Sequence, residues 1–196
     1  MVTADEFGRS LRGAADILTR RPQGLAAFEM SEAGFRRSFQ AIGLTLPAYI
    51  VSLAVERRAL GLADAPVLSD VPLDLLVGAG HLAGFLALPL AMIVVLRGTP
   101  FAARYMPFVI VTNWVAVFGS LVLAGPSILL LLGIHGPELA GLVTLALAVL
   151  VLEAHWFAAK ATLGISGWQA AGVTLLGLLL VLATNGLTDM LACQLG

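Results

Sequence analysis

The chain has 196 residues, of which 59% are hydrophobic and 12% charged, with a mean hydropathy of +0.97 and a formal net charge of −1. A soluble domain carries about 25% charged residues, so this composition excludes an ordinary soluble protein and indicates an integral membrane protein. The near-zero charge leaves no basic footprint for nucleic acid, and the single cysteine, Cys193, excludes an internal disulfide and a cysteine-based zinc site.

Residues 1–30 are predicted to form a cytoplasmic amphipathic arm with a helix from Thr3 to Arg21. Thr3 and Glu6 have the spacing of a capping box, and Pro22 ends the helix. The apolar residues of one face are Phe7, Leu11, Ala14 and Leu18. The arm contains no apolar run long enough for a secretory signal, so we expect an uncleaved first span. Two positions for the arm stay open: flat on an anionic leaflet, or packed across the mouth of a helical bundle.

Residues 31–196 are predicted to form an all-α membrane bundle of five spans. The predicted spans are residues 39–55, 73–96, 107–132, 139–159 and 168–190. Ser31 is a suitable N-cap ahead of the first span, which Pro47 interrupts. Pro89 is expected to kink the second span, and Pro126 to bend or break the third.

The stretch from Leu139 to Gln169 is predicted to be a helical hairpin that crosses the membrane twice. Its first apolar run ends in Glu153, His155 and Trp156, and a short loop with Lys160 leads to the last span. Three tryptophans, Trp114, Trp156 and Trp168, are expected near one interface, where an aromatic belt explains them.

The distribution of cations predicts that the N-terminus lies inside and the C-terminus outside. With that orientation, nine of the eleven Lys and Arg residues fall in inner segments, and the exceptions are Arg57 and Arg58. The acidic residues Asp64 and Asp70 fall in the outer loop between the first two spans. We therefore expect a multi-pass protein of a cell inner membrane.

Polar residues within the spans are predicted to lie in two layers. Asn113, Glu153 and His155 fall near the inner helix ends, with Arg104 beside them, and these four are the candidate binding residues. An outer layer contains His81 and Asn185. Groups at one depth on different spans can meet.

Glu153 has two interpretations. It is either a proton or cation site with Asn113 and His155 as hydrogen-bond partners, or an interfacial carboxylate paired with a nearby cation. The candidate cations are Arg104, Arg97 and Lys160. We favour the interfacial pair, because Glu153 is close to a helix end.

Gly80 and Gly84 form a GxxxG pattern that predicts close helix packing on the second span. His81 is expected to be an interhelical hydrogen-bonding residue rather than a metal ligand. His135 and Glu138 are spaced three residues apart, a spacing that chance often produces, so no metal or cofactor is predicted. The sequence has no HExxH, GxSxG or phosphate-binding glycine loop, so we predict that the protein is not an enzyme.

Two short segments resemble the Yip family of Rab-interacting membrane proteins, and bacterial members in particular. One is Tyr105-Met106-Pro107 followed by Asn113-Trp114, and the other is the final hairpin with Trp156 and Gly164-Ile165-Ser166. The resemblance covers about residues 30 to 190 and implies a five-span membrane fold. The longer acidic arm of eukaryotic members is missing here, so the resemblance does not extend to GTPase binding.

Three functions follow as hypotheses. The leading one is a non-enzymatic inner-membrane protein that organises the membrane or partner proteins. The second is a small transporter or permease-like protein that uses the polar layer around Glu153, and the third is an accessory subunit of a larger membrane complex. The expected partners are the lipid bilayer and other membrane proteins or a second copy of the chain, with no nucleic acid.

Overall fold

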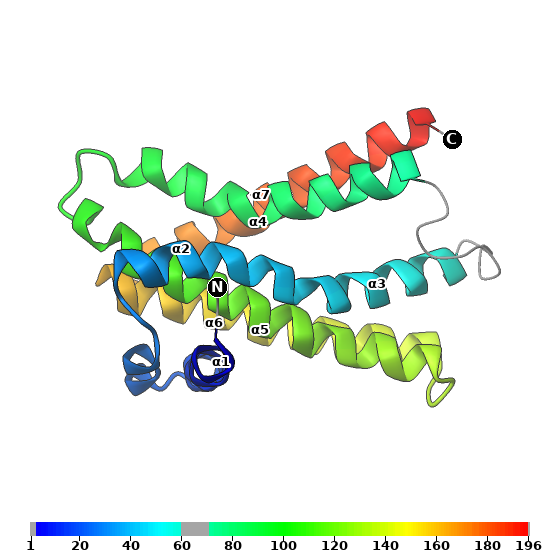
Figure 1. Cartoon of the computed structure of the whole chain (residues 1–196), viewed down its shortest axis with the longest axis horizontal. Helices are drawn as coiled ribbons and strands as arrows, with labels where there is room; N and C mark the ends of the chain where they lie inside the picture. The colour runs from blue at the N-terminus through cyan, green and yellow to red at the C-terminus, as the bar shows by residue number, and fades with distance from the viewer. Residues whose placement is uncertain (1–2, 60–70, 196) are drawn as a thin grey trace.

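The structure, a computed structural model, describes residues 3–59 and 71–195 and is all-α over these ranges (Figure 1). Five of its helical segments are long and apolar enough to cross a membrane, so the chain is a multi-pass membrane protein. The elements in chain order are α1 (Ala4–Leu18), η1 (Pro22–Ala27), α2 (Glu32–Gln40), η2 (Ala41–Thr45), α3 (Leu46–Ala59), α4 (Val71–Leu96), η3 (Ala102–Arg104), α5 (Tyr105–Leu131), α6 (Pro137–Leu163) and α7 (Gly167–Leu195). The predicted loop residues Asp64 and Asp70 lie outside the described ranges.

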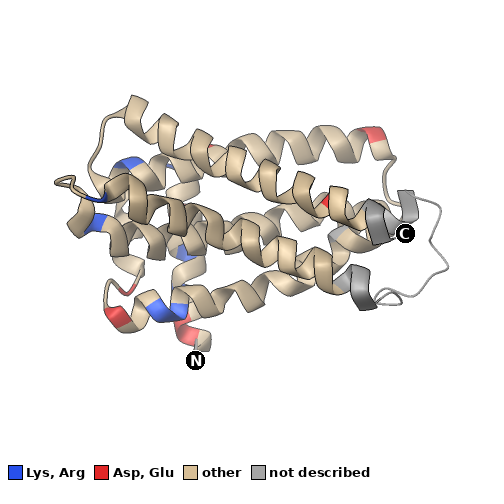
Figure 2. Ribbon diagram, turned by 90° about the horizontal axis from the view of Figure 1, so that it is seen from above, with Lys and Arg blue, Asp and Glu red and all other residues tan. Residues whose placement is uncertain are grey.

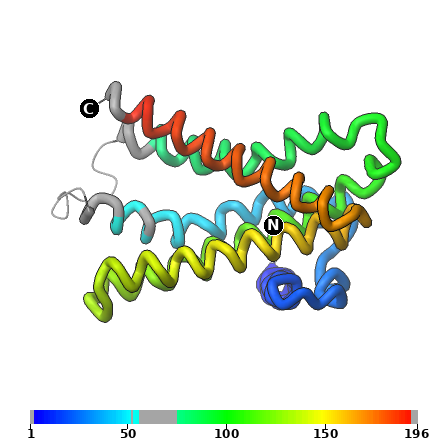
Figure 3. The backbone as a smooth tube through the Cα atoms, turned by 180° about the vertical axis from the view of Figure 1, so that it is seen from behind, coloured from blue at the N-terminus to red at the C-terminus, as the bar shows by residue number. Residues whose placement is uncertain are grey.

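The helices form two groups that meet along the bundle axis. Helices α4 and α7 run side by side in one group, and α3, α5 and α6 form the other, as opposite views show (Figures 1 and 3). Helix α1 lies across α5 and α6 near one end. We call this the arm end, which also holds the α4–α5 loop and the α6–α7 turn. The opposite end, with the α5–α6 turn and the C-terminus, is the far end.

The first span is a continuous column of α2, η2 and α3 rather than one regular helix. Ser31 caps it, because its hydroxyl accepts a hydrogen bond from the Gly34 amide at 3.1 Å, which confirms the predicted N-cap. The 3₁₀ turn η2 ends two residues before Pro47, the second residue of α3, whose ring has no N–H to continue the helical hydrogen bonds. The span runs from Glu32 to Val55, so its start is earlier than predicted.

The structure selects one of the two alternatives predicted for the third span, and it moves one predicted boundary of the fourth. Helix α5 is continuous through Pro126, so the third span is one helix and not a helix plus a half-helix. Helix α6 runs on to Leu163, which places Lys160 in its last turn instead of the loop. It ends at Gly164, whose φ of 66° is the left-handed conformation typical of a glycine C-cap.

The N-terminal arm is packed on the bundle mouth, one of the two positions left open. Thr3 caps α1 by accepting from the Glu6 amide at 3.2 Å. The buried residues of α1 are Glu6, Ser10, Gly13, Ala14 and Ile17. The other predicted apolar residues, Phe7, Leu11 and Leu18, pack partly buried against the same core. The Glu6 carboxylate binds Arg37 of the first span.

Helix α5 is the centre of the packing. Its buried residues between Phe108 and Val117 contact α1, α6 and the first span. Trp114 is only 2% exposed and lies against Phe7 of α1, with ring centroids 6.3 Å apart. The aromatic-belt prediction is therefore wrong for Trp114, which is a core residue. Trp168 is 90% exposed, as an interfacial tryptophan should be.

Candidate functional site

A cavity of about 380 Å³ lies between the α4–α7 pair and the group formed by η2, α5 and α6. Its lining runs from Thr112 to Leu123 on α5 and from Thr174 to Asn185 on α7. Eleven residues of α-helix rise about 16 Å, so the cavity is a slot parallel to the helix axes. Most of the lining is apolar, with polar groups from several elements among it.

The lining follows helical periodicity on each element. On α5 it recurs at Asn113, Ala116, Ser120 and Leu123, and on α4 and α7 it recurs at the same three- and four-residue steps. Sequence reasoning missed the small and hydroxyl residues of this stripe, which are Thr45, Thr112, Ala116, Gly119, Ser120, Thr174 and Gly177. A signal existed on the third and fifth spans, because such residues repeat along one face of each, at positions 112, 116, 119 and 120 and at positions 174 and 177.

Asn113 is the most buried amide of the site, at 3% exposure. Its Nδ2 donates to the Ser38 hydroxyl at 3.0 Å, and Ser38 in turn donates to the Phe35 carbonyl at 2.8 Å. The chain of bonds joins α5 to α2 and fixes the orientation of the amide. The proton-site interpretation of Glu153, the one not favoured, made Asn113 its hydrogen-bond partner, and the structure gives Asn113 Ser38 instead.

His155 lines the same cavity from α6. Its Nδ1 lies 2.8 Å from the Val151 carbonyl oxygen, which can only accept, so Nδ1 carries a proton. In the neutral ring Nε2 is then a hydrogen-bond acceptor. The structure thus brings Asn113 and His155 to one cavity, as the inner-layer prediction expects.

The predicted outer layer opens onto this cavity as well. His81 Nε2 lies 2.9 Å from the Thr45 hydroxyl, and its ring packs on Tyr49 with centroids 4.9 Å apart. Asn185 lines the cavity from an exposed position on α7. The two predicted layers are therefore parts of the wall of one slot that runs along the helices.

Glu153 lies away from this cavity. Its carboxylate pairs with the Arg20 guanidinium at the arm end, where the two side chains are 30% and 60% exposed. Glu153 and His155 are two residues apart on one helix, and such residues do not share a face. The structure places Glu153 in an interfacial ion pair, but its partner comes from the arm and not from Arg104, Arg97 or Lys160.

Arg20 reaches Glu153 from an uncommon backbone conformation. Its φ is 57°, and the Arg21 amide donates to the Asp16 carbonyl at 2.8 Å in the pattern of a Schellman motif. A left-handed residue here is usually glycine. Arg104, one of the cations considered for Glu153, has a different partner. Its Nη1 donates to the Leu163 carbonyl at 2.8 Å and caps the end of α6.

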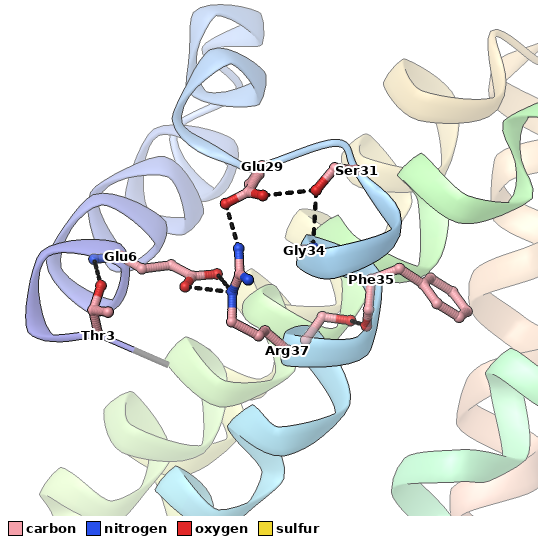
Figure 4. A network of polar contacts seen from close by, with 8 residues as sticks. Thr3, Glu6, Glu29, Ser31, Gly34, Phe35 and Arg37 are labelled. Carbon is pink, nitrogen blue, oxygen red and sulfur yellow. Dashed lines mark hydrogen bonds and ion pairs between the residues drawn. The ribbon is translucent and has the colours of Figure 1, made fainter. Parts of the chain in front are cut away.

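A second polar network fastens the arm to the first span (Figure 4). Arg37 Nε donates to Glu6 at 2.9 Å, and its Nη2 binds the Glu29 carboxylate. Ser31 donates to the other oxygen of Glu29 at 2.7 Å. The Ser31 hydrogen bond, followed by that of Arg37, lowers the pKa of the Glu29 carboxyl below its ordinary value.

Gly80 and Gly84 lie against α7. A Cβ on Gly80 would meet the Thr188 hydroxyl at 2.2 Å, and one on Gly84 would meet the Thr184 hydroxyl at 3.2 Å. These glycines thus permit the close approach of α4 and α7 within the chain.

Among the described residues, no group of three or more His, Cys, Asp or Glu side chains comes together where it could hold a metal ion. His135 contacts the Gly136 carbonyl at 3.3 Å in the α5–α6 turn. The chain matches no family model, and neither a curated protein sequence nor a solved structure shows significant similarity to it. The likeness to the Yip family therefore stays a prediction from short motifs.

Proposed function

We propose that the protein is a non-enzymatic membrane protein that binds a small, uncharged, mainly apolar molecule in the cavity between α4, α5, α6 and α7. The observation that carries this proposal is the cavity itself. Its volume of about 380 Å³ falls in the range of roughly 300–1,000 Å³ typical of small-molecule sites. An apolar wall with a few polar groups of fixed orientation is the usual composition of such sites.

The lining supports an uncharged ligand, since none of its residues is Asp, Glu, Lys or Arg. Several hydroxyls already donate to backbone carbonyls of their own helices, as Thr174 does to Ala170 at 3.0 Å and Ser120 does to Val117 at 2.8 Å. The oxygens of these hydroxyls offer lone pairs to a ligand. A neutral, elongated molecule with a hydroxyl or amide donor matches both the shape and the hydrogen-bonding character of the slot.

The position of Glu153 argues against a transporter driven through that residue. A coupling carboxylate needs to face the ligand path, and Glu153 pairs with Arg20 outside the cavity. Permease-like movement of a neutral ligand through the slot remains a narrower proposal. It differs from binding alone by a flux measured in sealed vesicles.

The organising role and the accessory-subunit role depend on the membrane or on protein partners, and not on a small molecule in the cavity. The close helix packing predicted at Gly80 and Gly84 is made with α7 of the same chain and not with a further subunit. Stoichiometric protein partners retained in mild detergent would support these roles. The absence of such partners, together with a retained small molecule, would support the proposal that the cavity binds a ligand.

The test is to purify the protein in mild detergent and identify retained small molecules by mass spectrometry. Ala116→Phe fills the cavity from α5, and Ala146→Phe adds the same side chain on an exposed face of α6. We expect the retained molecule to be lost from Ala116→Phe and kept in Ala146→Phe. Asn113→Leu or His155→Leu should weaken retention while the bundle still folds.

Retention that is equal in Ala116→Phe and Ala146→Phe would overturn the proposal. A folded Ala116→Phe protein is required for that comparison, and its helicity and monodispersity supply the check. If Ala116→Phe does not fold, Leu123→Phe at the other end of the lining replaces it.

We propose further that the arm end faces the cytoplasm of a cell inner membrane. The support is the cation count of the sequence together with the placement of Arg97, Arg104 and Lys160 at the same end as the arm (Figure 2). Reporter fusions at His135 and after Gly196 should both report the outer side. A cytoplasmic signal from either fusion would contradict this orientation.

A further inference from the structure

The arm end carries two sets of basic residues that differ in their partners. On the arm side, Arg20 pairs with Glu153, and Arg37 pairs with Glu6 and Glu29. On the other side, Arg97 and Arg104 lie between α4 and α5, and Lys160 lies in the last turn of α6. No acidic residue occurs between positions 97 and 108 or between 154 and 169. Positive charge is therefore balanced internally on one side only.

We propose that Arg97, Arg104, Lys160 and Trp168 form a surface that binds the headgroup of an anionic phospholipid. All four are exposed. We call them the hairpin surface. The inference goes beyond the cavity and does not depend on it.

Internal contacts hold the hairpin surface in shape. Arg104 Nη1 bonds to the Leu163 carbonyl, one helical turn after Lys160. The Lys160 ammonium lies 5.1 Å from the centre of the Trp156 ring, whose Nε1 donates to the Gly167 carbonyl at 2.9 Å. Preordered cations lose less conformational freedom when an anion binds.

Apolar packing joins the two segments that carry the surface. Leu96, which precedes Arg97, belongs to the same buried cluster as Leu163, and Phe101 and Ile165 pack against it. The loop and the turn therefore form one unit. Figure 2 shows Lys and Arg gathered at this end of the bundle.

The depth of the surface matches the headgroup layer. Arg97 follows directly on the apolar span Leu75–Leu96, and Lys160 lies in the last turn of the span that ends at Leu163. The exposed Trp168 is one residue into α7, where an amphipathic ring contacts headgroups and the upper acyl chains. A phosphodiester with its acyl chains alongside α4 and α7 satisfies the cations and the tryptophan together.

The test compares lipid retention by native mass spectrometry after purification from nanodiscs that contain equal amounts of phosphatidylglycerol and phosphatidylcholine. The variant is the double change Arg97→Gln and Lys160→Gln, which leaves the Arg104 bond to Leu163 intact. The matched control is Arg9→Gln with Arg36→Gln, two exposed arginines of the arm side. Both doubles remove the same charge.

We expect the wild type to retain phosphatidylglycerol in preference to phosphatidylcholine. The preference should fall about fivefold for each cation removed from the hairpin surface and should stay unchanged in the arm-side control. Trp168→Ala should weaken retention of both lipids without changing the preference.

Two results would overturn the proposal. One is an equal loss of preference in the two doubles, which would reduce the effect to net charge. The other is that soluble glycerol phosphate or a polyglutamate peptide raises the thermal unfolding temperature as much as phosphatidylglycerol does. That result would indicate a site for free anions or acidic proteins instead of a lipid.

Discussion

The two ends of the bundle are packed by different means. At the arm end, Phe108, Trp114, Ala158 and Leu163 are almost fully buried, and α1 adds a further layer over α5 and α6. At the far end, most α7 residues from Val181 to Leu191 are exposed. Large interlocking side chains determine the arm end, whereas small residues and lipid-facing leucines characterise the far end.

This difference shows which kinds of contact hold each end of the bundle together. In a bilayer the hydrophobic effect does not drive helices together, so association relies on van der Waals packing and hydrogen bonds. At the arm end, α1 packs as a further layer over α5 and α6 and adds van der Waals contacts and polar contacts. The far end uses close backbone approach at Gly80, where α7 contributes Thr188.

The largest expected effect comes from the buried tryptophan. Trp114→Ala should lower the free energy of unfolding by about 3–5 kcal/mol, because it leaves a cavity under α1. Leu145→Ala on the lipid-facing side of α6, 64% exposed, is the control and should change it by under about 1 kcal/mol. Denaturant unfolding in detergent measures both, and equal effects would remove the distinction between the two ends.

The glycine contact gives the corresponding test at the far end. Gly80→Val should cost about 1–3 kcal/mol, because its Cβ meets Thr188 at 2.2 Å. Gly78→Val is a control on the same helix, where an added Cβ meets nothing within 4 Å. Thr188→Ala should partly rescue Gly80→Val in a double-mutant cycle. If Thr188→Ala gives no rescue, the loss of stability in Gly80→Val does not come from the contact with Thr188.

A smaller effect is expected at the ion pair that joins the arm to α6. Glu153→Gln should cost under about 1 kcal/mol, because the pair with Arg20 is partly exposed. The cost should shrink with added salt, and no pH-dependent flux should be lost in vesicles. Glu138→Gln at the far end is the control. A robust pH-dependent flux that Glu153→Gln abolishes would restore the transporter role of this carboxylate.

The smallest expected effect is pH-dependent and comes from Glu29. Its pKa is lowered in the folded chain, so its bonds to Ser31 and Arg37 stabilise the fold above the ordinary carboxyl pKa. That contribution is lost as the pH falls through the lowered pKa. Thermal unfolding should show Glu29→Gln less stable than wild type at neutral pH and equal to it in acid. The same loss in Glu32→Gln would point to net charge instead of this network.

Much of the fold could be predicted from the sequence, because composition and apolar length decide a membrane bundle almost alone. The cap at Ser31 and the interruption near Pro47 followed from local chemistry as well. The ends of the spans were harder to predict. Lys160 was expected in a loop, but α6 continues through it to the C-cap at Gly164.

The candidate site was only partly predictable. Spacing along a span gives depth, so Asn113 and His155 could be expected to meet. Depth does not give the face of the helix, and Glu153 at a similar depth points to a different neighbour. The partners Ser38 and Arg20 come from segments far away in the chain, and no local pattern identifies such long-range pairs.

The docking of the arm has a consequence for biogenesis. Helix α1 is made before α5 and α6, yet Phe7 packs on Trp114 of α5 and Arg20 binds Glu153 of α6. The contacts of the arm with α5 and α6 can therefore form only after these two spans have been made, although Glu6 can bind Arg37 earlier. Protease resistance of residues 4–27 therefore reports when α1 has docked on α5 and α6 in a newly made molecule.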